Sequence, residues 1–317
     1  MIAIKTNVVE DAINVFRSKI EEQRRNALDK LTVLQRDFAS SFQQVEKDYL
    51  NKVIACFLSS DIITGEPSFL DETTRNIGVV PDTQINSRSF HWRITKCIGY
   101  DDLRGTFYPE YFQKLGIKTC VYCNSQLAVS AEKKRGGLSA KFQVDHYRPK
   151  SEYPFLSISL YNLYPTCAAC NLAKRKKHVN FNLYEDTIAQ SRYKFMLEKG
   201  SVANYLLTRN VNNIKFTFVD PDASNTSSVT DSFLETFDIQ GIYDTQKDII
   251  EEMIIKAAIY DDFYKKTLID SFPHLFSKHG LYNRFILGNY DAPEDIHKRP
   301  MAKFMQDIAR SDELKLI

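Results

Sequence analysis

The segment YNLYPTCAACNLAKRKKH, residues 161–178, contains two cysteines separated by two residues, and a second such pair lies upstream in CVYC, residues 120–123. A two-residue gap lets both sulfurs of a pair turn toward one ion, and two pairs complete a tetrahedral zinc site. A redox-active pair, or two unrelated buried pairs, has the same spacing. Two pairs that bracket a basic segment favour structural zinc, bound by Cys120, Cys123, Cys167 and Cys170.

The composition is that of a soluble globular protein. The chain has 317 residues, enough for one large domain or two to three ordinary ones. Apolar residues make up 43% and charged residues 26%, and the mean hydropathy is -0.35. No apolar run approaches the ~20 residues that span a bilayer, and acids interrupt the first residues where a signal peptide requires an apolar stretch. We therefore expect a cytoplasmic protein with no membrane partner.

Two regions have the pattern of amphipathic helices. No Gly or Pro occurs before Gly65 or between Gly241 and Pro273, and apolar residues in both regions recur at helical spacing. We therefore expect three parts: a mainly helical N-terminal region, a central module with short strands, and a mainly helical C-terminal region. These parts correspond to residues 1–115, 116–182 and 183–317.

The central module contains residue types suited to phosphodiester hydrolysis. The stretch AKFQVDHY, residues 140–147, alternates in polarity and predicts a strand that ends at Asp145 and His146. An isolated Asp-His pair is most often a hydrogen-bonded surface pair. Here Asn162, the second cysteine pair and Asn171 follow it in order. A neutral imidazole can take a proton from water, and a hard cation held by a carboxylate and an amide oxygen can neutralise a phosphate.

In this order, CVYC, VDHYRPKS and YNLYPTCAACNLAK make the chain similar to the HNH endonucleases, the ββα-metal nucleases. The resemblance covers about residues 116–180. It implies an α+β fold in which a small ββα-metal core with a structural zinc is flanked by mainly helical regions. The resemblance also implies that the protein is a metal-dependent endonuclease.

The same resemblance implies the roles of four residues. Asp145 would be a ligand of the catalytic divalent ion, and His146 would be the general base. Asn162 would brace the loop that orients His146, and Asn171 would be the second metal ligand. The third family position is Asn in this chain instead of His, which is similar to the H-N-N variant. A neutral oxygen ligand favours Mg²⁺ or Mn²⁺ over zinc in the catalytic site.

Positive charge is concentrated around the cysteine pairs, although the formal net charge is only +2. Residues 131–180 contain ten Lys or Arg and three acids. Such a block indicates a polyanion surface, with a solvated face as the alternative. We expect contacts with DNA or RNA from Arg148, Lys150, Lys174, Arg175, Lys176 and Lys177. Lys174 follows Asn171 by three residues on the same helical face, where it would meet the scissile phosphate.

The regions outside the central module are similar to the HNH subunits of bacterial anti-phage systems of the Septu type, including their retron-associated versions. In those systems the nuclease pairs with an ATPase. The resemblance implies an ATPase partner, and the acidic helical C-terminal region is a candidate docking surface. An ordinary helical domain packed on the core is the alternative. A catalytically inactive, zinc-stabilised nucleic-acid-binding subunit is the alternative to a nuclease.

Overall fold

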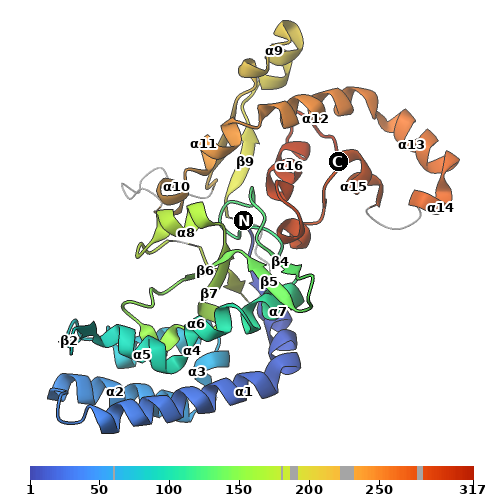
Figure 1. The fold of residues 1–317 in the computed structure, drawn as a ribbon. Helices are drawn as coiled ribbons and strands as arrows, with labels where there is room; N and C mark the ends of the chain where they lie inside the picture. Colours follow the sequence, from blue (N-terminus) through green and yellow to red (C-terminus); the bar gives the residue numbers. More distant parts are fainter. Residues whose placement is uncertain (60, 180, 186–191, 222–231, 277–280) are drawn as a thin grey trace. The chain divides into compact units, whose positions relative to one another are not determined.

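The computed structural model describes the whole chain except residues 60, 180, 186–191, 222–231 and 277–280. The described residues form many helices and five two-stranded sheets (Figure 1), which confirms the α+β class. They divide into two compact units, each assembled from segments that are distant in sequence. The larger unit comprises Ile4–Ile117 and Ala128–Thr187, and the smaller unit comprises Met1–Ala3, Lys118–Leu127 and Ile188–Ile317. These discontinuous units differ from the three consecutive parts that the sequence suggests.

The larger unit begins with seven helices. They are α1 (Thr6–Asp37), α2 (Gln44–Leu58), α3 (Asp61–Thr64), α4 (Pro67–Ile77), α5 (Phe90–Ile98), α6 (Tyr100–Arg104) and α7 (Phe107–Lys114). Helix α1 is long because no Gly or Pro interrupts it, and most of its buried side chains are three, four or seven residues apart, which places them along one face. Helix α2 begins with a capping box, in which Glu46 accepts a hydrogen bond from the backbone N–H of Gln43 at 2.8 Å.

Short strands complete this helical part of the larger unit. Strand β1 (Ile4–Lys5) pairs in parallel with β8 (Tyr184–Glu185), so the start and the end of the unit lie side by side. Strands β2 (Gln84–Ile85) and β3 (Arg88–Ser89) form a small antiparallel hairpin before α5.

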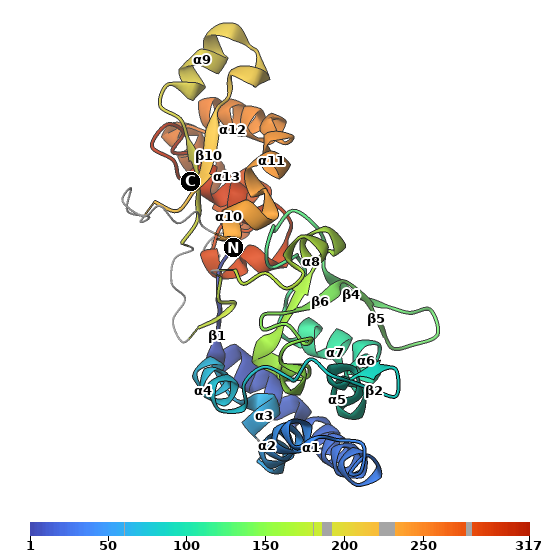
Figure 2. The same cartoon turned by 90° about the vertical axis from the view of Figure 1, so that its left-hand side faces the viewer.

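Two further hairpins and one helix follow in the larger unit (Figure 2). Strand β4 (Val129–Glu132) pairs with β5 (Leu138–Lys141), and β6 (Gln143–His146) pairs with β7 (Leu163–Thr166). Helix α8 (Ala168–Lys174) begins directly after β7. This order of two strands and a helix positions all the residues implied by the resemblance, except the first cysteine pair.

The predicted strand over residues 140–147 is divided in the structure. Ala140 and Lys141 belong to β5, and β6 begins only at Gln143. Between them Phe142 is buried, and its ring packs edge-on against Phe112 of α7 with 5.4 Å between the centroids. The chain therefore changes direction at an anchored aromatic residue.

The basic segment after Cys170 does not continue as a helix. Helix α8 ends at Lys174, and Arg175 follows with φ +48°, which is outside the helical region. Arg175, Lys176 and Lys177 therefore lie beyond the helix, and all three are exposed.

The smaller unit is built on the antiparallel pair β9 (Lys194–Leu197) and β10 (Phe216–Val219). Phe195 of β9 lies 4.5 Å from Tyr243 and 5.0 Å from Phe304 between ring centroids, so aromatic side chains form its core. Its helices are α9 (Ser201–Thr208), α10 (Ser232–Phe237), α11 (Ile239–Asp244), α12 (Lys247–Ile259), α13 (Asp262–Ser271), α14 (Pro273–Phe276), α15 (Leu281–Leu287) and α16 (Ala302–Ala309).

The helical pattern expected between Gly241 and Pro273 is present, although it is divided among several helices. Helices α13 and α14 contain no buried side chain. Among the described residues, no helix is both long and apolar enough to cross a membrane.

Candidate functional site

The four cysteines predicted to bind zinc lie together. Their sulfur atoms are all within 4.8 Å of one another, and they form the one group of at least three His, Cys, Asp or Glu side chains within metal-binding distance among the described residues. None of the four takes part in a disulfide. A tetrahedral zinc with Zn–S bonds of about 2.3 Å requires sulfurs about 3.8 Å apart, so small side-chain adjustments suffice. The group can therefore hold one metal ion such as zinc.

Local backbone geometry explains how each pair presents its sulfurs. The N–H of Asn124 bonds the carbonyl of Cys120 at 2.9 Å, which closes a tight turn around the first pair. In the second pair, Cys167 is the N-cap of α8, and its sulfur accepts the N–H of Cys170 at 3.5 Å. A helix N-terminus and a backbone donor both favour the thiolate form that zinc requires.

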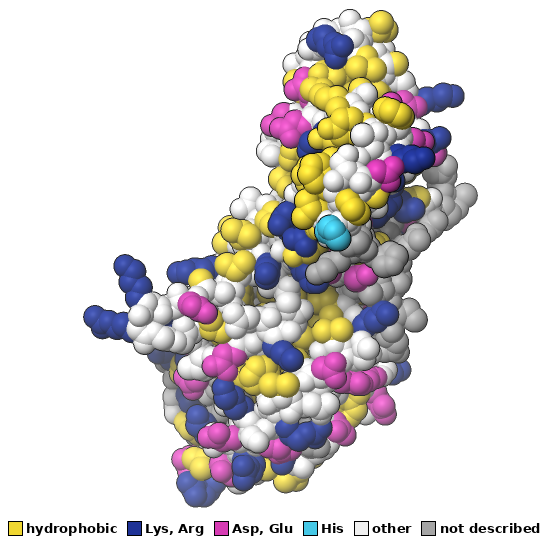
Figure 3. All heavy atoms as spheres, turned by 90° about the vertical axis from the view of Figure 1, so that its right-hand side faces the viewer, with side chains coloured by type: hydrophobic (Ala, Val, Ile, Leu, Met, Phe, Trp, Pro, Cys, Tyr) yellow, Lys and Arg dark blue, Asp and Glu magenta, His cyan; other side chains and the backbone are white. Residues whose placement is uncertain are grey.

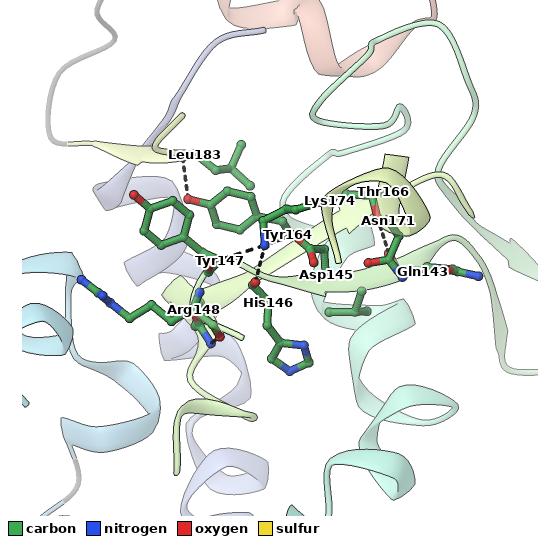
Figure 4. A network of polar contacts seen from close by, with 12 residues as sticks. Gln143, Asp145, His146, Tyr147, Arg148, Tyr164, Thr166, Asn171, Lys174 and Leu183 are labelled. Carbon is green, nitrogen blue, oxygen red and sulfur yellow. Dashed lines mark hydrogen bonds and ion pairs between the residues drawn. The ribbon is translucent and has the colours of Figure 1, made fainter. Parts of the chain in front are cut away.

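Asp145 forms a buried ion pair with Lys174 (Figure 4). The Lys174 ammonium lies 3.1 Å from Oδ2 of Asp145, and the two side chains are 0% and 6% exposed. The same ammonium donates to the carbonyl of His146 at 2.8 Å. Two charges removed from water are tolerated only when they are paired and hydrogen-bonded. Lys174 therefore fastens α8 to the end of β6.

The structure places Lys174 differently from the sequence-based expectation. The sequence assigns it to the scissile phosphate, yet its side chain is fully buried and its ammonium is used by Asp145 and a carbonyl. The helical spacing from Asn171 is as expected, but the sequence cannot indicate that this face of α8 packs against β6.

His146 is held as a neutral base. Its Nε2 lies 3.0 Å from the carbonyl oxygen of Ser157. Because a carbonyl oxygen can only accept, Nε2 carries the proton and Nδ1 is left with its lone pair. Burial lowers the pKa of His146 to about 3, with a further contribution from the charge of Lys150. The imidazole is therefore uncharged at neutral pH.

The imidazole of His146 and the carboxylate of Asp145 leave β6 on opposite sides. Successive residues of a strand point to opposite faces, and Figure 4 shows the ring directed away from Lys174. On its own side the ring lies 4.8 Å from that of Tyr100, between centroids. Asp145 and His146 therefore both lie at the end of β6, as the sequence predicts, but their side chains point to opposite sides of the strand.

Asn162 connects the two ends of the loop that follows β6. Its side-chain oxygen accepts the N–H of Arg148 at 2.8 Å, and its amide donates to the carbonyls of Arg148 at 3.2 Å and Leu156 at 3.0 Å. Asn162 is 1% exposed. The loop it braces includes Ser157, whose carbonyl holds His146.

Asn171 lies on α8 beside β6, where its amide nitrogen donates to Oε1 of Gln143 at 2.5 Å. This bond leaves its oxygen as the group available for a cation. The Asp145 carboxylate and the Asn171 oxygen are hard donors, so in type they fit Mg²⁺ or Mn²⁺. Lys174 opposes such an ion, because its ammonium already neutralises the same carboxylate.

The remaining predicted nucleic-acid contacts are in different environments. Arg148 forms an ion pair with Asp71 of α4. The Lys150 ammonium lies 4.2 Å from the centre of the Tyr100 ring, a cation–π contact. Only Arg175, Lys176 and Lys177 are exposed.

Three residues of the site are not signalled by the sequence: Tyr100, Ser157 and Gln143. Tyr100 packs on the His146 ring from α6, which precedes the central module, and Ser157 acts only through its backbone carbonyl. Gln143 lies two residues before Asp145, and period-two alternation places both side chains on the same face of the strand. That alternation was the one available signal.

No model of a known protein family matches the chain, and neither a curated protein nor a solved structure is significantly similar to it.

Proposed function

We propose that the protein is a metal-dependent endonuclease that hydrolyses phosphodiester bonds in nucleic acid at the end of β6. The observation that carries the proposal is the hydrogen bond from Nε2 of His146 to the carbonyl of Ser157. It fixes a tautomer in which Nδ1 has the lone pair that can accept a proton.

In this proposal each residue of the chain has a separate task. Nδ1 of His146 takes the proton from the attacking water, and Tyr100 and Ser157 keep the ring in position. Asn162 keeps the loop that follows β6, which includes Ser157, closed behind the ring. A divalent ion bound by Asp145 and Asn171 would neutralise charge on the phosphate and on the leaving oxygen. Lys174 would have to release the Asp145 carboxylate for that ion, because the ammonium and the ion compete for the same oxygens.

The second candidate is a zinc-stabilised nucleic-acid-binding subunit without activity. It is favoured by the low exposure of Asp145 and His146, 5% and 6%, and by the ammonium already paired with the carboxylate. Incubation of zinc-loaded protein with plasmid DNA and with RNA, in Mg²⁺ or Mn²⁺, separates the two candidates. Cleavage that is lost in both Asp145→Ala and His146→Ala supports the nuclease, whereas binding without cleavage supports the second candidate.

We also propose that the C-terminal helices dock a partner subunit, an ATPase according to the resemblance to anti-phage systems. Large apolar side chains are exposed along α12–α15, including Phe263 at 79% and Leu275 at 58%, and Figure 3 shows hydrophobic side chains gathered on that face. Helix α13 buries no side chain, and short isolated helices are marginal in water. Copurification with the product of a neighbouring ATPase gene, lost in Phe263→Ser, tests this proposal. Copurification that the substitution leaves unchanged would contradict it.

A further inference from the structure

The β4–β5 hairpin stands out from its own unit. Figure 2 shows it extending beyond α6 and α7. Its base is attached to α7, where the hydroxyl of Ser130 donates to the carbonyl of Pro109 at 2.6 Å. Its far end, residues 132–137, is entirely exposed. The strands therefore rest against α7, and only the end of the ribbon, residues 132–137, is free of contacts with it.

The free end carries three consecutive cations, Lys133, Lys134 and Arg135. All are exposed, and none takes part in the ion pairs formed within the described residues. Lys and Arg side chains project from the corresponding edge in Figure 3. If these three cations only kept the surface solvated, they would not need to be clustered at the end of a projecting ribbon.

The turn that displays these cations has a defined shape. The N–H of Lys133 bonds the carbonyl of Gly137 at 2.9 Å, and the N–H of Gly136 bonds the carbonyl of Lys133 at 3.0 Å. Gly136 and Gly137 have φ of +85° and +77°. Other residues adopt this left-handed region only at about 1–2 kcal/mol. The glycines thus let the ribbon close tightly behind Lys134 and Arg135.

The strands of the ribbon are thin. Ser130, Ala131, Ser139 and Ala140 form its two central pairs, so only small side chains flank the backbone there. Antiparallel strands lie ~4.8 Å apart, and four residues extend ~14 Å. The major groove of B-form DNA is about 12 Å wide and 8.5 Å deep, whereas the minor groove is only about 6 Å wide. The ribbon fits the first and is too broad for the second.

We propose that the β4–β5 hairpin is a nucleic-acid-binding element that enters the major groove of duplex DNA, with its tip cations on phosphates. This inference rests on the proposed nuclease function, which is the reason for choosing nucleic acid as the ligand. Ala131 and Ser139 lie on the face opposite to Ser130, so they can approach base edges and thymine methyl groups in that groove. The major groove of A-form RNA is deep and narrow, so duplex RNA should not admit the ribbon.

The test is equilibrium binding of zinc-loaded protein to fluorescent duplexes of about 20 base pairs, without Mg²⁺ or Mn²⁺, at several salt concentrations. The tip variant combines Lys133→Ala, Lys134→Ala and Arg135→Ala. Each lost phosphate contact lowers the slope of log K against log salt by about 0.9, so the slope should fall by about 2–3 and DNA affinity at least tenfold. Duplex RNA should lose clearly less. A DNA slope that is unchanged, or an equal loss on RNA, overturns the proposal.

Two matched variants complete the test. Arg25→Ala, Lys30→Ala and Arg36→Ala together remove the same charge from exposed positions of α1 and should leave the slope nearly unchanged. If they weaken binding as much as the tip variant, charge alone accounts for it and the proposal fails. Gly136→Val with Gly137→Val keeps every cation but strains the turn and should weaken DNA binding. Wild-type binding by this variant would show that the shape of the ribbon is not used.

Binding is measured without cleavage, so the two proposals can fail separately. Loss of DNA binding in the tip variant of a protein that never cuts would support the ribbon and contradict the nuclease. If instead cleavage depends on His146 and the tip variant binds DNA normally, the nuclease is supported and the ribbon is contradicted.

Discussion

Replacement of Lys174 by Met should destabilise the larger unit strongly. Methionine has nearly the same volume, so the change removes a charge and its hydrogen bonds but leaves little cavity. Asp145, with a side chain only 6% exposed, then remains buried beside an apolar group. Removal of one partner of a buried ion pair costs roughly 3–5 kcal/mol. For a unit of this size, 1 kcal/mol shifts the Tm by about 2–4 °C, so a decrease of ~6–20 °C is expected.

The assay is thermal and urea unfolding of purified, zinc-loaded protein, with two controls. Lys96 pairs with Asp101 on the surface, where the side chains are 50% and 54% exposed, and Lys96→Met should cost less than about 1 kcal/mol. The double variant Lys174→Met with Asp145→Asn removes both charges and should recover most of the loss.

The Lys174→Met variant also tests whether Lys174 competes with a divalent ion for Asp145. If Lys174 competes with a cation for Asp145, Mn²⁺ should stabilise Lys174→Met more than the wild type, by about 2.7 kcal/mol at a concentration 100 times Kd. A Lys174→Met variant as stable as Lys96→Met would refute the reasoning about the buried pair. Equal stabilisation of both proteins by Mn²⁺ would refute the competition.

The remaining predictions concern metal content, pH and the division of roles. Elemental analysis of fresh protein should give one zinc per chain, and its removal should unfold the cysteine region; protein without zinc would contradict the cysteine site. Burial lowers the pKa of His146 to about 3 and of His297 to about 4. The unfolded chain therefore gains protons first as pH falls below 6.5, and each histidine should reduce stability by about 1 kcal/mol between pH 6.5 and 5.5. Urea unfolding at pH 6.5 and 5.5, with His297→Gln showing the weaker dependence, checks this; identical dependence would contradict it. By calorimetry, Asp145→Ala should lose Mg²⁺ or Mn²⁺ binding and His146→Ala should keep it; the reverse would exchange their roles.

The local chemistry of the site was predictable from spacing, because short motifs fix local geometry. The two CxxC pairs predicted the cysteine group, whose four sulfurs lie together. The alternation before His146 correctly predicted a strand end at that residue. Spacing carries this information because two-residue gaps and period-two alternation constrain neighbouring side chains whatever the rest of the fold does.

Long-range packing was not predictable from one sequence. The burial of Lys174 depends on which face of α8 meets β6, and the division of residues 140–147 depends on Phe142 finding Phe112. The β4–β5 hairpin did have a local signal, since Gly136 and Gly137 follow three cations between two alternating segments. Its three cations by themselves indicate only a basic block.

The central claim is that His146 acts as the general base, and single-turnover cleavage by His146→Gly tests it most directly. The protein would be zinc-loaded, with Mg²⁺ or Mn²⁺ present, and the rate measured with and without free imidazole. We predict a rate about 10²–10⁴ lower than that of the wild type, partly restored by imidazole entering the space left by the ring, and no such restoration for Asp145→Ala. Cleavage by His146→Gly at the wild-type rate without imidazole would contradict the account.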